Sequence, residues 1–504
     1  MAFEKKYFEV AKKGILPKSE ISVECNISAG ANVAKVLSLL VDARVENTEV
    51  LNGVINFSGI LDTKMVFCSE NDEINTICAQ CPFSSKFESV EIEAGQTPLI
   101  KVSVIDSRVE SVGGESVRVL ALLEQSGVIV CNQQVMTIAC HDSDVCIKNE
   151  DIETIKYIGS AEEEIVVESE INIRENIKKV LLLESGVVVK SVDAGTNFAT
   201  VSGEVISRVL YLGENDKFES GYIYDTFKEE VELASLTRDS LVEGDAVVAK
   251  AGATTEIVQE EKGGKLVVKV PVVITVRGYE RVQVGVINDL YSTSGDIAVT
   301  TSSYNMTETC PVELVEGKIE GSLTLDENAP RVDKLLFHGG NSVTITNTYI
   351  KDGEVTIEGV ARTTAVYLND ETSELHSVQL ETPFTISDKT NCDDDALIWA
   401  NAYVSDVDVV VKKGREFYYD AKVKVTVSCS RQLTSGIISE ATLTAENKEK
   451  DYAMEVIFAP AGKELWDIAK SAKVREEQII LQNPDVIFPT ATDTPLVLFN
   501  QRLQ

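Results

Sequence analysis

The chain repeats one sequence pattern three times, within residues 54–72, 198–216 and 354–372. In each stretch a glycine follows an apolar residue by two positions and precedes an aromatic residue by eight, and an acidic segment comes next. The aligned glycines are Gly59, Gly203 and Gly359. Because they stand about 150 residues apart, each copy has the length of a domain rather than of a short solenoid unit.

The agreement continues on both sides of each glycine. About 24 residues before it, a lysine precedes two apolar residues, and a similar distance after it comes a phenylalanine. The lysines are Lys35, Lys179 and Lys334, and the phenylalanines are Phe83, Phe227 and Phe384. Several positions that agree at nearly fixed offsets indicate an internal repeat, so we expect one fold to occur three times.

Each copy has the sequence pattern of antiparallel strands. Apolar and polar residues alternate through 343–349 and 421–427, which is the period of a strand with one buried face. Gly53 and Gly353 each follow an Asn or Asp, the chemistry of a two-residue hairpin turn. The repeated glycine lies within a strand, where a β-bulge or a close backbone approach would require it. We therefore predict a mainly β chain with three tandem antiparallel sandwich-like domains, at residues 1–150, 151–305 and 306–448.

Residues 451–504 follow a different pattern. A short strand at 454–458 precedes a turn, and apolar residues at helical spacing follow over 465–470. A second helix is expected over 475–481, and a closing strand at 496–499. The C-terminal segment is therefore predicted to be a small βααβ unit, near the lower size limit for independent folding.

This unit resembles the LysM domain. Gly462, the Leu-Trp-Asp-Ile-Ala-Lys run at 465–470 and the Asn-Pro pair that begins at Asn483 match the motif of that family. Lys463 stands where the family usually has an aspartate, and the ending at 489–496 departs from the usual pattern. Because these departures fall in loops that hold glycan in typical members, the resemblance implies the fold more strongly than it implies glycan binding.

The combination of β-repeats with one C-terminal LysM unit is more specific than either part. Over nearly its whole length the chain resembles the SPOCS-domain proteins of spore-forming Firmicutes. The resemblance implies a spore-coat morphogenetic protein that is made in the mother cell and then lies at the forespore surface. It also implies that the LysM unit binds another coat protein, the ATPase that forms the basement layer of the coat.

Two loops of the LysM unit are the predicted docking surface, for a protein partner or for glycan. In this fold they lie side by side, because both helices pack on one two-stranded sheet. The residues are Ala461, Gly462, Lys463 and Glu464 in the first loop and Asn483, Asp485, Val486, Ile487 and Phe488 in the second. The apolar run at 486–488 either completes the small core or provides an exposed anchor for a partner. Trp466 is interpreted as a core residue rather than a ligand-stacking one.

The net charge of −34 favours solubility and argues against partners that need a basic surface. Neither nucleic acid nor an anionic membrane surface is an expected partner. The first residues have no apolar signal-peptide core, and no run of about eighteen apolar residues occurs. We expect a protein that begins in a cytoplasm and has no membrane span.

Seven of the ten cysteines lie before residue 150, which does not fit a disulfide framework that staples every domain. We therefore expect reduced thiols. Cys78 and Cys81 are three apart on a predicted strand, so they should point to opposite faces and not share a zinc ion. Cys140, His141 and Cys146 offer metal-ligating groups, but a polar loop with two packed cysteines is favoured.

Residues suited to catalysis are few. The three histidines are His141, His338 and His376, which lie in different sequence contexts, and no phosphate-binding glycine motif occurs. The acidic runs 162–164 and 393–395 are interpreted as solvated loops rather than calcium sites. We predict no enzymatic activity, no cofactor and no bound metal.

The leading hypothesis is a structural adaptor of spore-coat or exosporium assembly. The β-domains would self-associate, since exposed edge strands are templates for pairing between chains, and the LysM unit would dock to the coat scaffold. The main alternative is a peptidoglycan-binding protein of the spore cortex or cell wall. A third hypothesis is a self-polymerising fibre or surface-layer subunit.

Overall fold

The chain folds almost entirely into β-strands. The computed structural model describes residues 3–71, 73–173, 176–214, 217–249, 251–259, 264–309, 313–372, 374–446 and 453–499. Within these ranges two short helices occur, both near the C-terminal end. The expectation of a mainly β chain with several antiparallel sheets is confirmed.

The first group of strands forms two sheets around one core. The strands are β1 (Phe3–Ser28), β2 (Val33–Leu51), β3 (Val54–Ser69), β4 (Ile74–Glu88), β5 (Thr97–Gly113) and β6 (Ser116–Cys140). β6 pairs with β1 and β5, and β3 pairs with β2 and β4, all in antiparallel register. Leu61, Phe67 and Leu123 are among the fully buried side chains between the two sheets, so this first sandwich has its own core.

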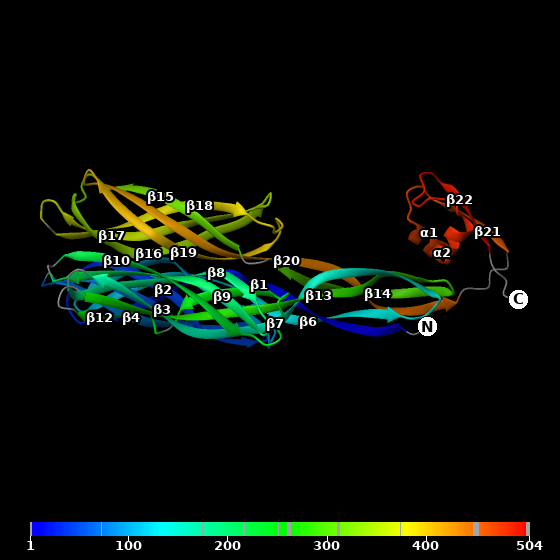
Figure 1. Cartoon of the computed structure of the whole chain (residues 1–504), viewed down its shortest axis with the longest axis horizontal. Coiled ribbons are helices and arrows are strands. Elements are labelled where there is room, and N and C mark those ends of the chain that lie inside the picture. The colour runs from blue at the N-terminus through cyan, green and yellow to red at the C-terminus, as the bar shows by residue number, and fades with distance from the viewer. Residues whose placement is uncertain are drawn as a thin grey trace.

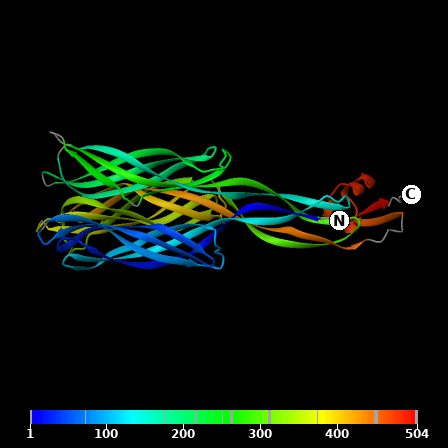
Figure 2. The same cartoon turned by 90° about the horizontal axis from the view of Figure 1, so that it is seen from below.

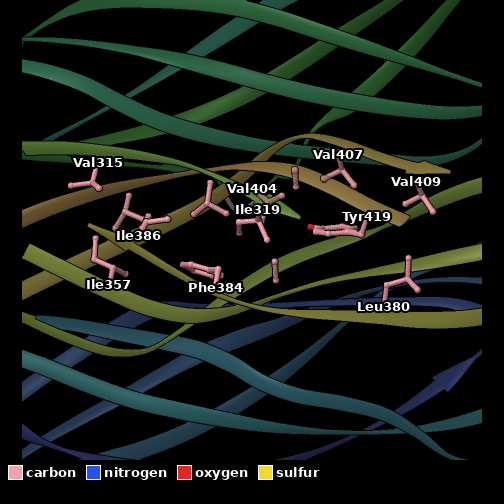
Figure 3. Close-up of a cluster of buried hydrophobic side chains, with 14 of the residues drawn as sticks. Val315, Ile319, Ile357, Leu380, Phe384, Ile386, Val404, Val407, Val409 and Tyr419 are labelled. Atoms are coloured by element: carbon pink, nitrogen blue, oxygen red, sulfur yellow. The ribbon is translucent and has the colours of Figure 1, made fainter. Parts of the chain in front are cut away.

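The next two groups of strands are arranged in the same way. The second sandwich contains β7 (Val145–Ile173), β8 (Ile177–Ala194), β9 (Phe198–Gly213), β10 (Phe218–Glu232), β11 (Leu241–Val248), β12 (Thr254–Gln259) and β13 (Gly264–Ser292). The third contains β14 (Gly295–Thr309), β15 (Glu313–Thr324), β16 (Val332–Lys351), β17 (Glu354–Asn369), β18 (Leu375–Lys389), β19 (Leu397–Lys412) and β20 (Glu416–Glu446). In the third sandwich, Ile357 and Phe384 from one sheet meet Ile319 and Val404 from the other (Figure 3).

Three pairs of long strands continue beyond the sandwiches as two-stranded ribbons (Figures 1 and 2). The pairs are β1 with β6, β7 with β13, and β14 with β20. Apolar side chains from all three ribbons pack together, and they include Val10, Val135, Val284, Met306 and Ile437. The predicted domain boundaries at 150 and 305 fall within the continuous strands β7 and β14, and the chain turns instead at 141–144 and 293–294.

The three sandwiches pack against one another at one end of the elongated molecule (Figures 1 and 2). One apolar cluster takes side chains from each of them, among which are Leu37, Val66, Leu181, Leu210, Phe337 and Val366. Beside this cluster, the edge strands β2, β5, β8, β11, β16 and β19 line a cavity of about 1480 Å³. These six edges therefore face a space within the chain, and the expected pairing between chains would have to use other edges.

Each repeated glycine faces the repeated phenylalanine of the neighbouring strand. Gly59, Gly203 and Gly359 are the register partners of Phe83, Phe227 and Phe384. A Cβ atom at Gly59 or Gly359 would lie 2.6 Å from the Cζ atom of that ring. On the other side of each glycine, the neighbouring strand has a register shift. A close approach and a bulge, the two reasons expected for these glycines, therefore occur together.

Two of the repeated lysines join neighbouring sandwiches. The ammonium group of Lys35 donates to the carbonyl oxygen of Leu375 at 2.8 Å, and that of Lys179 donates to the side chain of Asn75 at 2.8 Å. Each lysine thus contacts the first residues of the outer strand in a different sandwich, β18 or β4. Residues of the repeated pattern therefore form contacts between the sandwiches as well as within each of them.

The expectation of reduced thiols is wrong for one pair of cysteines. Cys25 of β1 and Cys81 of β4 form a disulfide, because the two strands lie on facing sheets with their Cα atoms 5.8 Å apart. Cys78 is exposed, on the other face of β4, as expected for residues three apart on a strand. Cys310 lies outside the described residues.

Two further features concern metals and membranes. Across the described ranges, His, Cys, Asp and Glu side chains form no group of three or more that could hold a metal ion. Cys140 and Cys146 are half-buried on either side of the turn that carries the exposed His141. Of the helices that the structure describes, none has the length and apolarity needed to cross a membrane.

Candidate docking site

The C-terminal unit contains four elements in the order strand, helix, helix, strand. They are β21 (Met454–Ala459), α1 (Leu465–Ala472), α2 (Glu476–Gln482) and β22 (Thr494–Phe499). β21 and β22 form an antiparallel two-stranded sheet, and one face of it packs against both helices. The buried side chains between them include Ala459, Ile468, Ala469, Ile479, Leu496 and Leu498.

Local sequence signals determine where the helices begin and end. Gly462 has a φ of 79°, which glycine adopts without strain, and it lies in the turn before α1. Asn483 follows α2 and donates its side-chain N–H groups to the carbonyl oxygens of Ile479 and Val497, both at 3.0 Å. Its Oδ1 atom accepts the Val497 N–H at 2.8 Å. The asparagine therefore fastens the end of α2 to β22.

Trp466 is buried between the unit and the ribbon formed by β7 and β13. Its ring meets Tyr291 of β13 edge to face, with ring centroids 5.0 Å apart. Its indole N–H donates to the Asp289 carboxylate at 2.8 Å. Trp466 is thus a packed residue, as interpreted from the sequence, and the side chains that cover it come partly from another region of the chain.

The basic side chains of the unit concentrate on this ribbon side. Lys470 pairs with Asp289 at 2.6 Å, Lys473 pairs with Asp296 at 2.5 Å, and Arg475 donates to the Ser143 carbonyl oxygen. Partial burial alone would raise the pKa of Asp289, but the donors Lys470 and Trp466 lower it overall. The contact therefore pairs basic residues at and after the end of α1 with carboxylates and a carbonyl oxygen of the ribbon strands and turn.

The first of the two predicted docking loops is tied to the segment that follows the second one. The N–H of Gly462 donates to the Thr490 carbonyl oxygen at 2.8 Å, and the N–H of Ala461 donates to Asp493 at 2.9 Å. Ala461, Gly462, Lys463, Glu464, Asp485 and Ile487 are exposed, and Asn483, Val486 and Phe488 are half-buried. Thr490 and Asp493 come after the second predicted loop at 483–488, so these hydrogen bonds fasten the first loop to the segment that precedes β22.

The apolar run at 486–488 divides between the two roles expected for it. Val486 and Phe488 pack against the core of the unit. Ile487 points away from that core, with 84% of its surface exposed. Of these three residues, Ile487 is the one that a partner can reach directly.

Comparisons with protein-family models, with curated proteins and with solved structures find no match. The candidate site is therefore argued from the residues and geometry of this chain.

Sequence reasoning missed two sets of residues. Asp289 and Tyr291 lie about 180 residues before the helix that they contact, and no local pattern marks such a distant pair. The apolar residues at alternate positions of β21 did have a signal, because Met454, Val456 and Phe458 follow the period of a strand. All three are exposed on the sheet face that lies opposite the helices.

Proposed function

We propose that the chain is a non-enzymatic adaptor of spore-coat assembly, with three SPOCS-type sandwich domains in tandem and a C-terminal LysM domain. The observation that carries this proposal is the position of the C-terminal unit at the far end of the ribbons, away from the sandwiches (Figure 1). The predicted docking loops are exposed there. A partner bound at the ribbon end leaves the outer surfaces of the sandwiches accessible for association with other coat components.

A buried ionic network fixes the orientation of the ribbons relative to the sandwiches. Glu243 of β11 accepts from Lys13 of β1 at 2.7 Å, from Tyr279 of β13 at 3.0 Å and from Thr309 of β14 at 3.2 Å. Ser428 of β20 donates to the same carboxylate at 3.1 Å. Because these strands belong to all three sandwiches and lie where the ribbons begin, the network ties the ribbons to the body of the molecule.

The positions of the histidines favour a structural role. His338 is on β16, and burial together with the charge of Arg208 lowers its pKa to about 3. His376 is on β18 beside Lys35, and His141 lies in the turn between β6 and β7. The three imidazoles lie on different elements and in different environments.

Glycan binding is the second candidate, and one observation favours it. The loop at 461–464 is fully exposed, and typical LysM domains hold glycan in the loops of this region. Against this, Trp466 is covered by Tyr291 and cannot stack on a sugar ring without separation from the ribbon. We therefore place a protein partner first.

The proposal is tested with the purified full chain and a variant that ends at residue 446. Binding to the purified coat basement-layer ATPase should require residues 447–504. Retention on purified sacculi should be weak for both forms. Strong retention on sacculi that depends on residues 447–504, without binding to the ATPase, would favour the glycan-binding alternative.

A further inference from the structure

We propose that the partner of this unit docks on the face of the β21–β22 sheet that lies opposite the helices, and that it does so with an amphipathic helix. This inference rests on the proposed adaptor function and specifies its surface and partner chemistry. We call this surface the outer sheet face. It consists of Met454, Val456, Phe458, Pro495, Val497 and Phe499.

The outer sheet face is continuous and wholly apolar. Its residues are cross-strand partners in three pairs: Met454 with Phe499, Val456 with Val497, and Phe458 with Pro495. Five of the six are exposed, and Phe458 exposes 70% of its surface. A contiguous apolar patch of this kind on a charged protein is typical of an interaction site, since single exposed apolar residues are scattered.

The side of the unit formed by α1 is already occupied by the ribbon. The sheet face that turns inward packs on α1 and α2, and α1 in turn packs on β13 through Trp466, Tyr291 and Asp289. A partner that used this side would have to displace a buried aromatic pair and an ion pair. The outer sheet face is reached without any such rearrangement.

The dimensions of this face match one helix. Six residues of strand span about 20 Å, and two strands with their side chains are about 10 Å wide. An α-helix is about 10 Å in diameter, and about 13 residues of it are 20 Å long. A helix on the outer sheet face would complete a three-layer arrangement, because the inner face of the same sheet already packs on helices.

The exposed charges of the unit, which lie on α2 and in loops rather than on the sheet face, favour a basic partner. Lys470, Lys473 and Arg475 are engaged at the ribbon. The unit also exposes the acidic residues Glu477, Asp485 and Asp493. The complementary helix therefore has apolar residues on one face and basic residues beside them, whereas a second copy of this chain would bring a net charge of −34. A glycan would find no hydrogen-bonding side chain on this face.

The test measures the affinity of the full chain for the purified coat basement-layer ATPase. Phe458→Asp and Val456→Asp each place a charge on the outer sheet face and should weaken binding at least tenfold. Leu481→Asp is the matched control, because Leu481 exposes 81% of its surface but lies on α2. Its affinity should stay within twofold of the unaltered chain, and all three variants should melt at the temperature of the unaltered chain.

Hydrogen exchange on the complex identifies the partner's segment. Amides in a helical segment with basic flanks should gain protection, together with β21 and β22 of this chain.

Failure of the unaltered chain to bind the ATPase would overturn the proposed function. If the unaltered chain binds the ATPase and the Phe458→Asp and Leu481→Asp variants bind it with equal affinity, the outer sheet face is not the docking surface, while the proposed function stands. A protected strand in the ATPase, or a Phe458→Asp variant that loses self-association in sedimentation velocity, would overturn the helix as the occupant.

Discussion

Gly203 lies at a point where two strands and an aromatic ring leave no room for a side chain. A Cβ atom there would lie 2.6 Å from the carbonyl oxygen of Val188, a backbone atom that cannot rotate away. Gly203→Ala should therefore destabilise the protein by about 1–3 kcal/mol in chemical denaturation. Gly285→Ala is the control, because the nearest atom to its Cβ would be a carboxylate oxygen of Asp151 at 3.4 Å. Equal midpoints for the two variants would show that the close approach is not important.

The disulfide between Cys25 and Cys81 is a second residue-scale feature. It closes a loop across 56 positions of sequence, and a crosslink of this span contributes about 2–4 kcal/mol by restricting the unfolded chain. Reduction should lower the denaturation midpoint accordingly. Alkylation of the unfolded, unreduced protein should leave Cys25 and Cys81 unmodified and modify the seven other cysteines that the structure describes. Cys78→Ser should leave the midpoint unchanged, and complete alkylation without reductant would show that the thiols are free.

At the scale of elements, the ion network around Glu243 makes the junction of the strands sensitive to acid. Burial alone would raise the pKa of Glu243, but the charges of Lys13 and Arg277 lower it to about 2. Because the folded pKa lies below the unfolded value of 4.5, the network stabilises the protein fully above pH 4.5. This contribution should be lost as the pH falls from 4.5 towards 2, as acid titrations of unfolding free energy can measure.

Removal of the carboxylate tests the same network. Glu243→Gln leaves Lys13 and Arg277 buried without their counter-ion and should cost roughly 3–5 kcal/mol at neutral pH. The variant should also lose part of the acid dependence between pH 4.5 and 2. Glu440→Gln removes an exposed pair with Lys5 and should change stability far less. An unchanged acid profile in Glu243→Gln would assign the acid sensitivity to other carboxylates.

At the scale of the whole molecule, Asp289 holds the C-terminal unit on the ribbon. Asp289→Ala removes the acceptor of the Trp466 indole and the partner of Lys470, interactions worth roughly 1–3 kcal/mol. The unit should then separate from the ribbon part of the time, with a broader distribution of maximum dimensions in X-ray scattering and a red-shifted tryptophan emission. Glu153→Ala on β7 of the same ribbon should change neither quantity. Unchanged scattering in Asp289→Ala would mean that Tyr291 and the other contacts are enough to hold the C-terminal unit on the ribbon.

The parts of this architecture that the sequence predicts are those with a local signal. Alternation predicts the strands, and the fixed offset between Gly203 and Phe227 reflects neighbouring strands whose lengths agree between copies. The ribbons had no such signal, because residues 148–151 are four consecutive polar, exposed residues that interrupt the alternation within β7. The pair of Lys13 with Glu243 is also unpredictable, since residues 230 positions apart meet through tertiary packing alone.

The same distinction applies to the candidate site. The motif around Gly462 and Asn483 predicted the order of the elements, because turns and helix ends depend on nearby residues. The contact of Trp466 with Asp289 depends on where the ribbon ends in space, which the sequence does not express. The outer sheet face was predictable from the alternation at Met454, Val456 and Phe458, but exposure of these residues is known only once the helices are placed.

The most direct test of the adaptor function is the location of the protein in sporulating cells. A fluorescent fusion of the full chain should form a ring at the forespore surface on the mother-cell side. The fusion that ends at residue 446 should remain diffuse in the mother cell, because it lacks the docking unit. A full-length fusion that stays diffuse, or that lies along the wall of vegetative cells, would contradict the account.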